Sequence, residues 1–359
     1  MKNFLSKLFF VLAVLPCMVS CFDDSDTEPP FVVEPATTGI YVLNSGMMDS
    51  NNSELTYFDM LTGEVAANVF MSANGKRLGD SGNDMLVYGS KMYIAVTGSA
   101  VVFVTDLKGK IVKEIAVNGG QSNLSPRQMT AANGKVYVTY MEGYVGAIDT
   151  ASFAVAKAQV GPYPEGIAYA YNKLYVAITD GNNYPHFENK VQILDPNSLA
   201  IKKELEVAYN PQTFHIAADN AMYLVCWGDY GANPASLHKI NPYTDEITAI
   251  EKVVPTNMTI GTNGKAYILS SVYDENWNQS IKYYVYDLKN DALEGELIPS
   301  DQLPDGYCIQ ADPQSGNVFV GTSDYVSNGD MYILSPAGKI LAKFDTGAIN
   351  PYKVCFIRK

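Results

Sequence analysis

The sequence contains few of the residues from which most catalytic and metal-binding sites are built. Its 359 residues include three histidines and five cysteines. It has no HExxH, no GxSxG, no phosphate-binding loop and no glycine-rich dinucleotide motif after a strand. His186, His215 and His238 lie near no motif that would use one of them as a base. We therefore expect no enzyme, no catalytic residue, no cofactor and no bound metal.

Positive charge is also scarce. Lysine and arginine number 25 against 38 aspartates and glutamates, which gives a net charge of −13. Proteins that bind nucleic acids need a basic surface that displaces counterions from the phosphates. The composition therefore argues against a nucleic-acid partner.

The N-terminus reads as an export signal. Lys2 and Lys7 precede an apolar run over residues 8–19, which is too short to cross a bilayer comfortably. The end of residues 1–21 resembles a bacterial lipobox, with Cys21 as the lipid-anchored residue. An ordinary cleaved signal with an incidental cysteine is the alternative. Residues 22–37 are acidic and rich in proline, and we interpret them as a tether.

Acidic residues directly after the lipidated cysteine resemble the tag that sends lipoproteins of gut Bacteroidota to the outer face of the outer membrane. That resemblance predicts an outer-membrane lipoprotein that faces the cell exterior.

One strand pattern with an aromatic residue recurs seven times. The aromatic positions are Tyr41, Tyr93, Tyr137, Tyr175, Tyr223, Tyr267 and Phe319. Each is followed by a second apolar run, a tight turn, a third run and a further strand that begins at a proline. This alternation, with frequent turns and no helical period, predicts an all-β fold. Seven units of four strands indicate a seven-bladed β-propeller over residues 38–359.

The two ends of the repeat distinguish a closed ring from a solenoid, which needs polar caps. The first unit lacks its proline-led strand, whereas the last is followed by an orphan strand, NPYKVCFIRK. We predict that residues 350–359 pair with residues 40–44 and complete the first blade, which removes exposed sheet edges.

The proline-led strands share a register, with Gly82 in place of proline in the first of them. Three positions later each has a large apolar residue, which we interpret as a contact between blades: Met85, Met129, Ile167, Phe214, Met258, Tyr307 and Val354. One position after the proline the residues are unlike one another and mostly hydrogen-bonding: Asn83, Arg127, Glu165, Gln212, Thr256, Asp305 and Tyr352.

In propellers this step lies at the mouth of the central channel, so we expect these side chains to converge on one ligand site. In the sixth unit, Asn257 beside Thr256 is the candidate. Ordinary variation of solvated loops is the alternative interpretation.

Five of the connections between the aromatic strand of a unit and the apolar run that follows it are long. We expect these loops on the same face of the ring as the channel mouth. They contain aromatic side chains in polar surroundings, which suggest a platform for a flat or ring-bearing ligand. The candidates are Tyr184, His186, Phe187, Trp227, Tyr230, Tyr273, Trp277 and Tyr325. Folding back of some of them over the blade core is the alternative.

Two further chemistries have weaker support. Glu165 and Asp305 would form an acid and base pair if they met at the channel mouth. Calcium would suit residues 49–54 or 180–183, but neither segment matches the twelve-residue calcium loop.

The cysteines beyond the leader are Cys226, Cys308 and Cys355, and they form no CxxC pair. We expect small buried thiols and no disulfide framework. Cys308 and Cys355 stand at the same predicted register on neighbouring blades, yet we expect both to be free because disulfide geometry is strict.

The segments TGIYVLNSG, NNSELTYFD, NGKRLGDSGNDM and GPYPEGIA, in a pattern that extends over residues 38–359, resemble the YncE-like propeller lipoproteins of Bacteroidota surfaces, the DUF5074 group. The best-understood branch of that group, BtuG, captures cobalamin outside the cell and passes it to the TonB-dependent transporter BtuB. The resemblance implies cobalamin (vitamin B12) or a related corrinoid as transported ligand, a BtuB-like partner, and membrane attachment through the lipid anchor. It assigns no individual contact.

A surface propeller that binds glycans or peptides, or that mediates adhesion, is the second interpretation. A hydrolase or lyase that uses Glu165 or Asp305 is the third.

Overall fold

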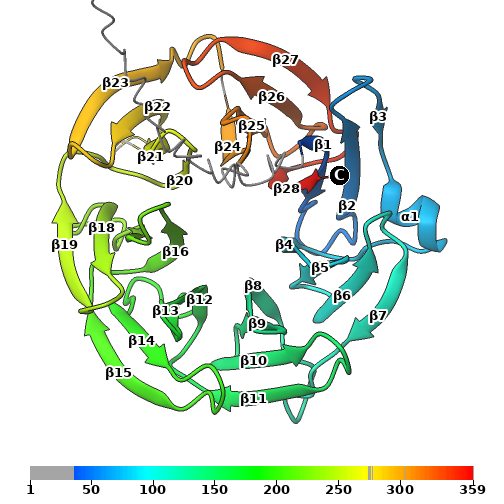
Figure 1. The fold of residues 1–359 in the computed structure, drawn as a ribbon, viewed down its shortest axis with the longest axis vertical. Coiled ribbons are helices and arrows are strands. Elements are labelled where there is room, and N and C mark those ends of the chain that lie inside the picture. Colours follow the sequence, from blue (N-terminus) through cyan, green and yellow to red (C-terminus); the bar gives the residue numbers. More distant parts are fainter. Residues whose placement is uncertain (1–35, 274–275, 277, 304, 359) are drawn as a thin grey trace, which may run out of the picture. The chain divides into compact units, whose positions relative to one another are not determined.

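Seven four-stranded antiparallel sheets surround a common axis in the computed structural model, which describes residues 36–273, 276, 278–303 and 305–358 (Figure 1). The predicted all-β, seven-bladed propeller is confirmed. The expectations for the signal peptide, the lipidated Cys21 and the tether up to residue 35 lie outside the described residues. Within those residues no helix has both the length and the apolar character needed to cross a bilayer.

Each blade is built from strands that follow one another from the axis outwards. The first blade consists of β28 (Pro351–Arg358), β1 (Thr37–Asn44), β2 (Glu54–Asp59) and β3 (Val65–Ala66). The second consists of β4 (Gly82–Tyr88), β5 (Lys91–Val96), β6 (Val101–Asp106) and β7 (Ile111–Ile115), and the third of β8 (Pro126–Ala132), β9 (Lys135–Tyr140), β10 (Tyr144–Asp149) and β11 (Val155–Gln159).

The next two blades carry most of the candidate site. The fourth consists of β12 (Pro164–Ala170), β13 (Lys173–Ile178), β14 (Lys190–Leu194) and β15 (Ile201–Glu206), and the fifth of β16 (Pro211–Ile216), β17 (Met222–Cys226), β18 (Ser236–Asn241) and β19 (Glu246–Ile250). The sixth consists of β20 (Asn257–Ile260), β21 (Lys265–Tyr273), β22 (Gln279–Asp287) and β23 (Ala292–Ile298), and the seventh of β24 (Gly306–Ala311), β25 (Val318–Thr322), β26 (Asp330–Leu334) and β27 (Ile340–Asp345).

The last strand closes the ring, as predicted. β28 pairs antiparallel with β1, and the register runs from Thr37 opposite Arg358 to Asn44 opposite Pro351. The C-terminus accordingly lies beside β1 in Figure 1. The Ser45 amide donates to the Asn350 carbonyl at 2.8 Å, which fixes the entry of β28. The pairing gives β1 a partner on both sides, so β1 has no unpaired edge.

In four of the blades the repeated tyrosine of the second strand joins the blade to the next one. Tyr137 donates its hydroxyl to the Pro196 carbonyl at 3.0 Å, and Tyr175 donates to the Pro242 carbonyl at 3.0 Å. Each acceptor lies in the outer turn of the following blade. Tyr41 and Tyr267 make the equivalent bonds. A buried phenol needs such a partner, and this requirement accounts for the recurrence of tyrosine.

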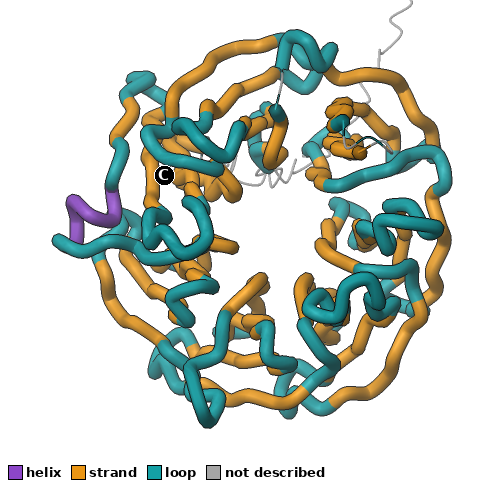
Figure 2. The backbone as a smooth tube through the Cα atoms, turned by 180° about the vertical axis from the view of Figure 1, so that it is seen from behind, coloured by secondary structure: helices purple, strands orange, loops and turns teal. Residues whose placement is uncertain are grey.

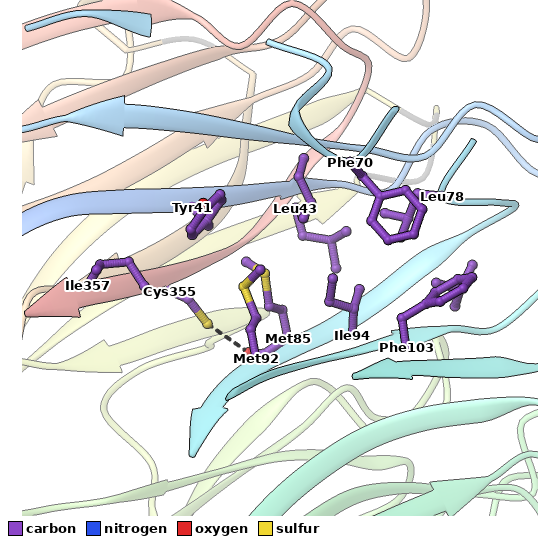
Figure 3. Packing of buried hydrophobic residues seen from close by; sticks show 12 residues of the cluster. Tyr41, Leu43, Phe70, Leu78, Met85, Met92, Ile94, Phe103, Cys355 and Ile357 are labelled. Atoms are coloured by element: carbon purple, nitrogen blue, oxygen red, sulfur yellow. Dashed lines mark hydrogen bonds between the residues drawn. The ribbon is translucent and has the colours of Figure 1, made fainter. Parts of the chain in front are cut away.

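Apolar side chains fill the interfaces between blades. Between the first two blades, Leu43, Met85, Met92 and Ile94 are 1% exposed or less (Figure 3). Cys355 joins the same cluster, and its thiol lies 3.1 Å from the Met85 carbonyl. Because these faces exclude water, each blade is stabilised mainly by its neighbours.

Cys226, Cys308 and Cys355, the cysteines within the described residues, are buried and free, as expected. Burial raises the pKa of both Cys308 and Cys355 to about 12. Their predicted common register is wrong, however, because Cys308 lies two positions after the first paired residue of its strand and Cys355 lies four after its own.

Two local features differ from the prediction. A short helix, α1 (Val69–Asn74), lies at the outer edge of the ring between the first two blades (Figure 2). The connection in the sixth blade is shorter than expected, because β21 and β22 continue as a hairpin to the pair Tyr273 and Gln279.

Candidate functional site

The inner strands begin at the same face of the ring from which the long loops emerge. In the fourth blade Pro164, the first residue of β12, pairs with Ile178, the last residue of β13. The loop that follows begins with the Asp180 amide, which donates to the Pro162 carbonyl at 3.1 Å. We call this face the mouth face. The predicted placement of the long loops beside the channel-mouth residues is therefore correct.

The predicted register holds in six blades and is wrong in the seventh. In the seventh blade Gly306, not Pro304, takes the place of the proline, because it pairs with Thr322 as Pro126 pairs with Tyr140. Asp305 has a φ of 58°, close to the values of Asn210 and Asn350, which stand immediately before the register position. Asp305 is thus exposed and precedes the mouth position.

Tyr307 occupies the mouth position that we assigned to Asp305. It was predicted to pack between blades, but that role belongs to Ile309, which is fully buried and pairs with Val320. A glycine is required before Tyr307, since a Cβ on Gly306 would lie 2.1 Å from the Tyr283 hydroxyl. The sequence contained a signal for this register: Gly82 already takes the place of the proline in β4, so a glycine could do the same in β24.

The centre of the site is an ion pair between two of the predicted residues. Arg127 donates from Nε to Glu165 Oε2 at 2.8 Å and from Nη2 to Glu165 Oε1 at 2.6 Å. The side chains are 20% and 4% exposed. Burial would lower the pKa of Arg127, but the charge and hydrogen bonds of Glu165 outweigh burial and raise it. The guanidinium therefore stays charged at the base of the site.

Arg127 is held from two further directions. Its carbonyl accepts a hydrogen bond from Asn83 Nδ2 at 2.9 Å, and its guanidinium lies 5.8 Å from the centre of the Tyr163 ring. The Asn83 bond holds the backbone of Arg127. The two Glu165 bonds with the Tyr163 ring hold the guanidinium plane, so the group is preorganised to meet a ligand.

A cavity of about 290 Å³ opens above this ion pair. It brings together three of the predicted mouth residues and four of the predicted aromatic residues. Its lining consists of Arg127, Tyr163, Glu165, Thr179, Gly181, Tyr184, Phe187, Asn210, Gln212, Trp227 and Tyr230. We call this cavity the mouth pocket. It has charged and amide groups together with an aromatic wall, which is the usual composition of a small-molecule site.

The aromatic wall comes from the long loops of the fourth and fifth blades. Tyr184, Phe187 and Tyr230 form a mutual cluster, with ring centres 5.7 to 6.5 Å apart. Tyr184 and Tyr230 remain 68% and 64% exposed. The loop of Tyr230 is shaped by Asp229, whose carboxylate accepts hydrogen bonds from the amides of residues 231 and 233.

Trp227 contributes to the wall and to the fold at once. Its indole donates to the Thr256 carbonyl at 2.8 Å, which ties the fifth blade to the sixth, and the side chain is 37% exposed. Trp227 therefore fits both interpretations given for the aromatic residues: it lines the pocket, and it packs on the fold.

Some predicted residues lie outside the mouth pocket. Asn83 supports Arg127 from behind, and Asn257 pairs with Leu269 one position beyond the mouth residue Thr256. His186 is exposed on the loop of the fourth blade. Tyr273 is on the extended hairpin, and Trp277 lies outside the described residues.

Two other predicted residues, Tyr325 and Tyr352, belong to a second aromatic group. Tyr307 lies between them, with ring centres 5.5 Å from Tyr325 and 5.8 Å from Tyr352. Sequence reasoning missed Tyr307 because of the register error described above.

The contacts give little basis for the acid and base pair. Both Glu165 oxygens accept hydrogen bonds from Arg127, and Asp305 lies exposed ahead of its strand, in a blade that is not adjacent. Among the described residues, no group of three histidine, cysteine, aspartate or glutamate side chains is arranged to hold a metal ion.

The fold and the mouth pocket define the class: a seven-bladed propeller with a polar and aromatic pocket on one face of the ring. Residues 38–328 match the family described as a domain of unknown function, DUF5074, and the chain belongs to that family. No curated protein matches the chain.

Three solved structures illustrate the similarity of fold. A quinonprotein alcohol dehydrogenase-like protein from Bacteroides thetaiotaomicron is 18% identical, with a TM-score of 0.65, and the match covers 90% of this chain and 79% of that one. A protein of unknown function from Bacteroides caccae is 10% identical, with a TM-score of 0.51 and coverages of 90% and 100%. Apo AztD from Citrobacter koseri is 11% identical, with a TM-score of 0.56 and coverages of 90% and 98%.

Proposed function

We propose that this protein is a non-catalytic binding protein of the cell surface that captures a corrinoid, such as cobalamin, and delivers it to a TonB-dependent outer-membrane transporter. The observation that carries the proposal is the mouth pocket, where Arg127, Glu165 and Gln212 lie among five aromatic side chains. The choice of a corrinoid as the ligand comes from the resemblance to the corrinoid-capturing branch of the DUF5074 group. The site offers hydrogen bonds and ring contacts but no free nucleophile or base.

The chemistry of the pocket suits the periphery of a corrinoid. Such a ligand is rigid, carries amide groups around its ring and has an aromatic base, so little ordering entropy is lost when it binds. The guanidinium of Arg127 is a donor for an amide oxygen, and Glu165 is an acceptor for an amide N–H group. Tyr184 and Tyr230 offer exposed rings to an aromatic base.

The size of the pocket limits how much of the ligand it takes. At about 290 Å³ it lies at the lower end of the range for small-molecule sites. A whole corrinoid is much larger, so the pocket would hold one edge of it while the rest remains above the mouth face.

A glycan is the second candidate, and the same size favours it. A cavity of this volume with exposed Tyr184 and Tyr230 at its rim accommodates a sugar ring stacked on an aromatic face. The two candidates differ in colour and in size, which makes them simple to distinguish.

Isothermal titration with cyanocobalamin tests the first candidate. We expect saturable binding at micromolar concentrations or below, and protein that stays pink after desalting. Absence of heat and of retained colour would contradict corrinoid capture. Retarded migration in gels that contain host or dietary glycans, with no cobalamin binding, would favour the second candidate.

Localisation has its own test, because Cys21 precedes the described residues. We propose lipid attachment at Cys21. Labelling of cells with a radioactive fatty acid should therefore mark the wild type and Cys17→Ala, which lacks the other cysteine of the leader, but not Cys21→Ala. Protease added to intact cells should remove the protein if it faces outwards. Label retained on Cys21→Ala would refute this anchor.

A further inference from the structure

A second aromatic group lies on the mouth face, apart from the mouth pocket. Tyr307, Tyr325 and Tyr352 come from three different segments: β24, the loop after β25 and the start of β28. The Tyr307 ring packs edge-on against Tyr325 at 5.5 Å, with an angle of 84° between the planes, and lies 5.8 Å from Tyr352. We call these residues the tyrosine cluster.

The tyrosine cluster is partly open to solvent. Tyr325 is 49% exposed, and the adjacent Val326 is 79% exposed. Tyr307 is half-buried, and burial followed by the nearby Tyr352 raises its pKa. The cluster thus combines a fixed inner ring with an outer ring that presents its face to solvent. The exposed ring beside a fixed one is a surface on which an apolar or ring-bearing ligand can pack.

Tyr352 connects the cluster to the mouth pocket. It occupies the mouth position of the first blade, and burial raises its pKa to about 12. The charges of Arg127 and Glu165 also act on its hydroxyl, in opposite directions. Tyr352 and Tyr307 occupy the mouth positions of the first and seventh blades, as Arg127 and Glu165 occupy those of the third and fourth, so the tyrosine cluster and the mouth pocket border the same opening of the ring.

We propose that the tyrosine cluster is a second subsite for the same ligand, and that it covers the apolar flank of a corrinoid whose edge lies in the mouth pocket. The inference rests on the proposed function. It follows from two facts: the pocket, at about 290 Å³, is too small for the whole ligand, and the cluster is an aromatic group whose members Tyr307 and Tyr352 stand at mouth positions of the same ring. One ligand would then be contacted on both sides of the axis at once, which increases the overall affinity.

The test uses cyanocobalamin as the probe in equilibrium dialysis, followed by its visible absorbance. Tyr325→Ala removes the exposed ring, and we expect about tenfold weaker binding. Tyr325→Phe keeps the ring and should stay within about twofold of the wild type. Tyr243→Ala is the matched control, because Tyr243 is 76% exposed in an outer turn on the opposite face; it should bind as the wild type does.

A second variant relates the cluster to the pocket. Tyr230→Ala removes part of the pocket wall, and its effect should multiply with that of Tyr325→Ala in the double variant, because separate contacts to one ligand add in free energy. Equal thermal unfolding midpoints would show that all variants are folded.

The outcomes separate the two proposals. If the wild type binds and Tyr325→Ala binds equally well, the ligand does not reach the cluster and the subsite is refuted, while corrinoid capture stands. If Tyr243→Ala loses as much affinity as Tyr325→Ala, the effect is not local and the subsite is refuted. If the wild type binds no cyanocobalamin, the proposed function fails and the subsite fails with it.

Discussion

Lys353 on the closing strand forms an ion pair with Asp84 on β4, with 3.0 Å between Nζ and Oδ1. The same carboxylate accepts the Met85 amide at 2.9 Å and the Met129 amide at 2.7 Å. Burial would lower the pKa of Lys353, but the charge and hydrogen bond of Asp84 outweigh it and raise the pKa. One side chain thus connects the inner strands of the first, second and third blades.

Replacing Asp84 with asparagine should therefore destabilise the ring. The change leaves the Lys353 charge without its counterion and weakens two amide contacts. We expect the free energy of unfolding to fall by about 2 kcal/mol, less than for a fully enclosed pair because the Lys353 side chain is 37% exposed. Urea denaturation measures this. Lys76→Gln, which breaks an exposed pair with Glu114 at 2.6 Å, should cost less than about 0.5 kcal/mol; an equal cost would contradict the role of Asp84.

Two tyrosines at equivalent positions should respond differently to loss of the hydroxyl. Tyr137→Phe leaves the buried Pro196 carbonyl without its donor, and we expect a loss of about 1 kcal/mol. The Tyr93 hydroxyl is buried and has no hydrogen-bond partner among the described residues, so Tyr93→Phe should be neutral or stabilising. The free energies of unfolding of the two variants, from urea denaturation, test this prediction. An equal loss of stability in both would show that the hydrogen bond of the Tyr137 hydroxyl does not stabilise the fold.

His215 should make stability depend on pH. Burial, and secondarily the nearby Lys353, lowers its pKa to about 3, whereas an unfolded histidine titrates near about 6.5. Below that value the unfolded chain takes up a proton that the folded chain does not, so stability falls as the pH drops from about 6.5 towards 3.

The variant His215→Gln isolates this contribution. Between pH 7 and pH 5 the wild type should lose about 1 to 2 kcal/mol more than the variant. His186→Gln is the control, since His186 is exposed on a loop, and it should follow the wild type. Parallel curves for the wild type and His215→Gln would refute the prediction.

The geometry of the Arg127 and Glu165 pair should distinguish arginine from lysine. Arg127→Lys keeps the charge but cannot make both hydrogen bonds, so we expect about 1 to 2 kcal/mol of destabilisation and weaker cyanocobalamin binding. Arg127→Met leaves Glu165, which is 4% exposed, without its partner, and should cost about 3 kcal/mol. The double variant with Glu165→Met should recover part of that loss in a double-mutant cycle. Strict additivity would show that the pair is not coupled.

The sequence predicted the fold well because the signals repeat. Seven tyrosine or phenylalanine strands and an orphan terminal strand were enough to count the blades and to predict the closure by β28. Each of these signals reflects a local requirement, such as a phenol that needs an acceptor on the next blade, and local requirements are visible in a single sequence.

The candidate site was only partly predictable. Arg127, Glu165 and Gln212 were found because their register is set by pairing within each blade, and this reasoning failed in the seventh blade, where Pro304 lies two positions ahead of Gly306. The division of the aromatic residues between the mouth pocket and the tyrosine cluster depends on loop conformations. Contacts such as those of Asp229 with the amides of residues 231 and 233 set these loop conformations. Such contacts differ from blade to blade, so they leave no repeating pattern in the sequence.

The closure by β28 also sets an order of events in the life of the chain. Blades two to seven are each made from one continuous segment, so the strands of each can pair once its own residues and those of a neighbouring blade have been synthesised. The first blade alone must wait, because β1 is made near the beginning and its inner neighbour at the very end. Until then β1 has an unpaired edge, and an open arc of blades precedes the closed ring.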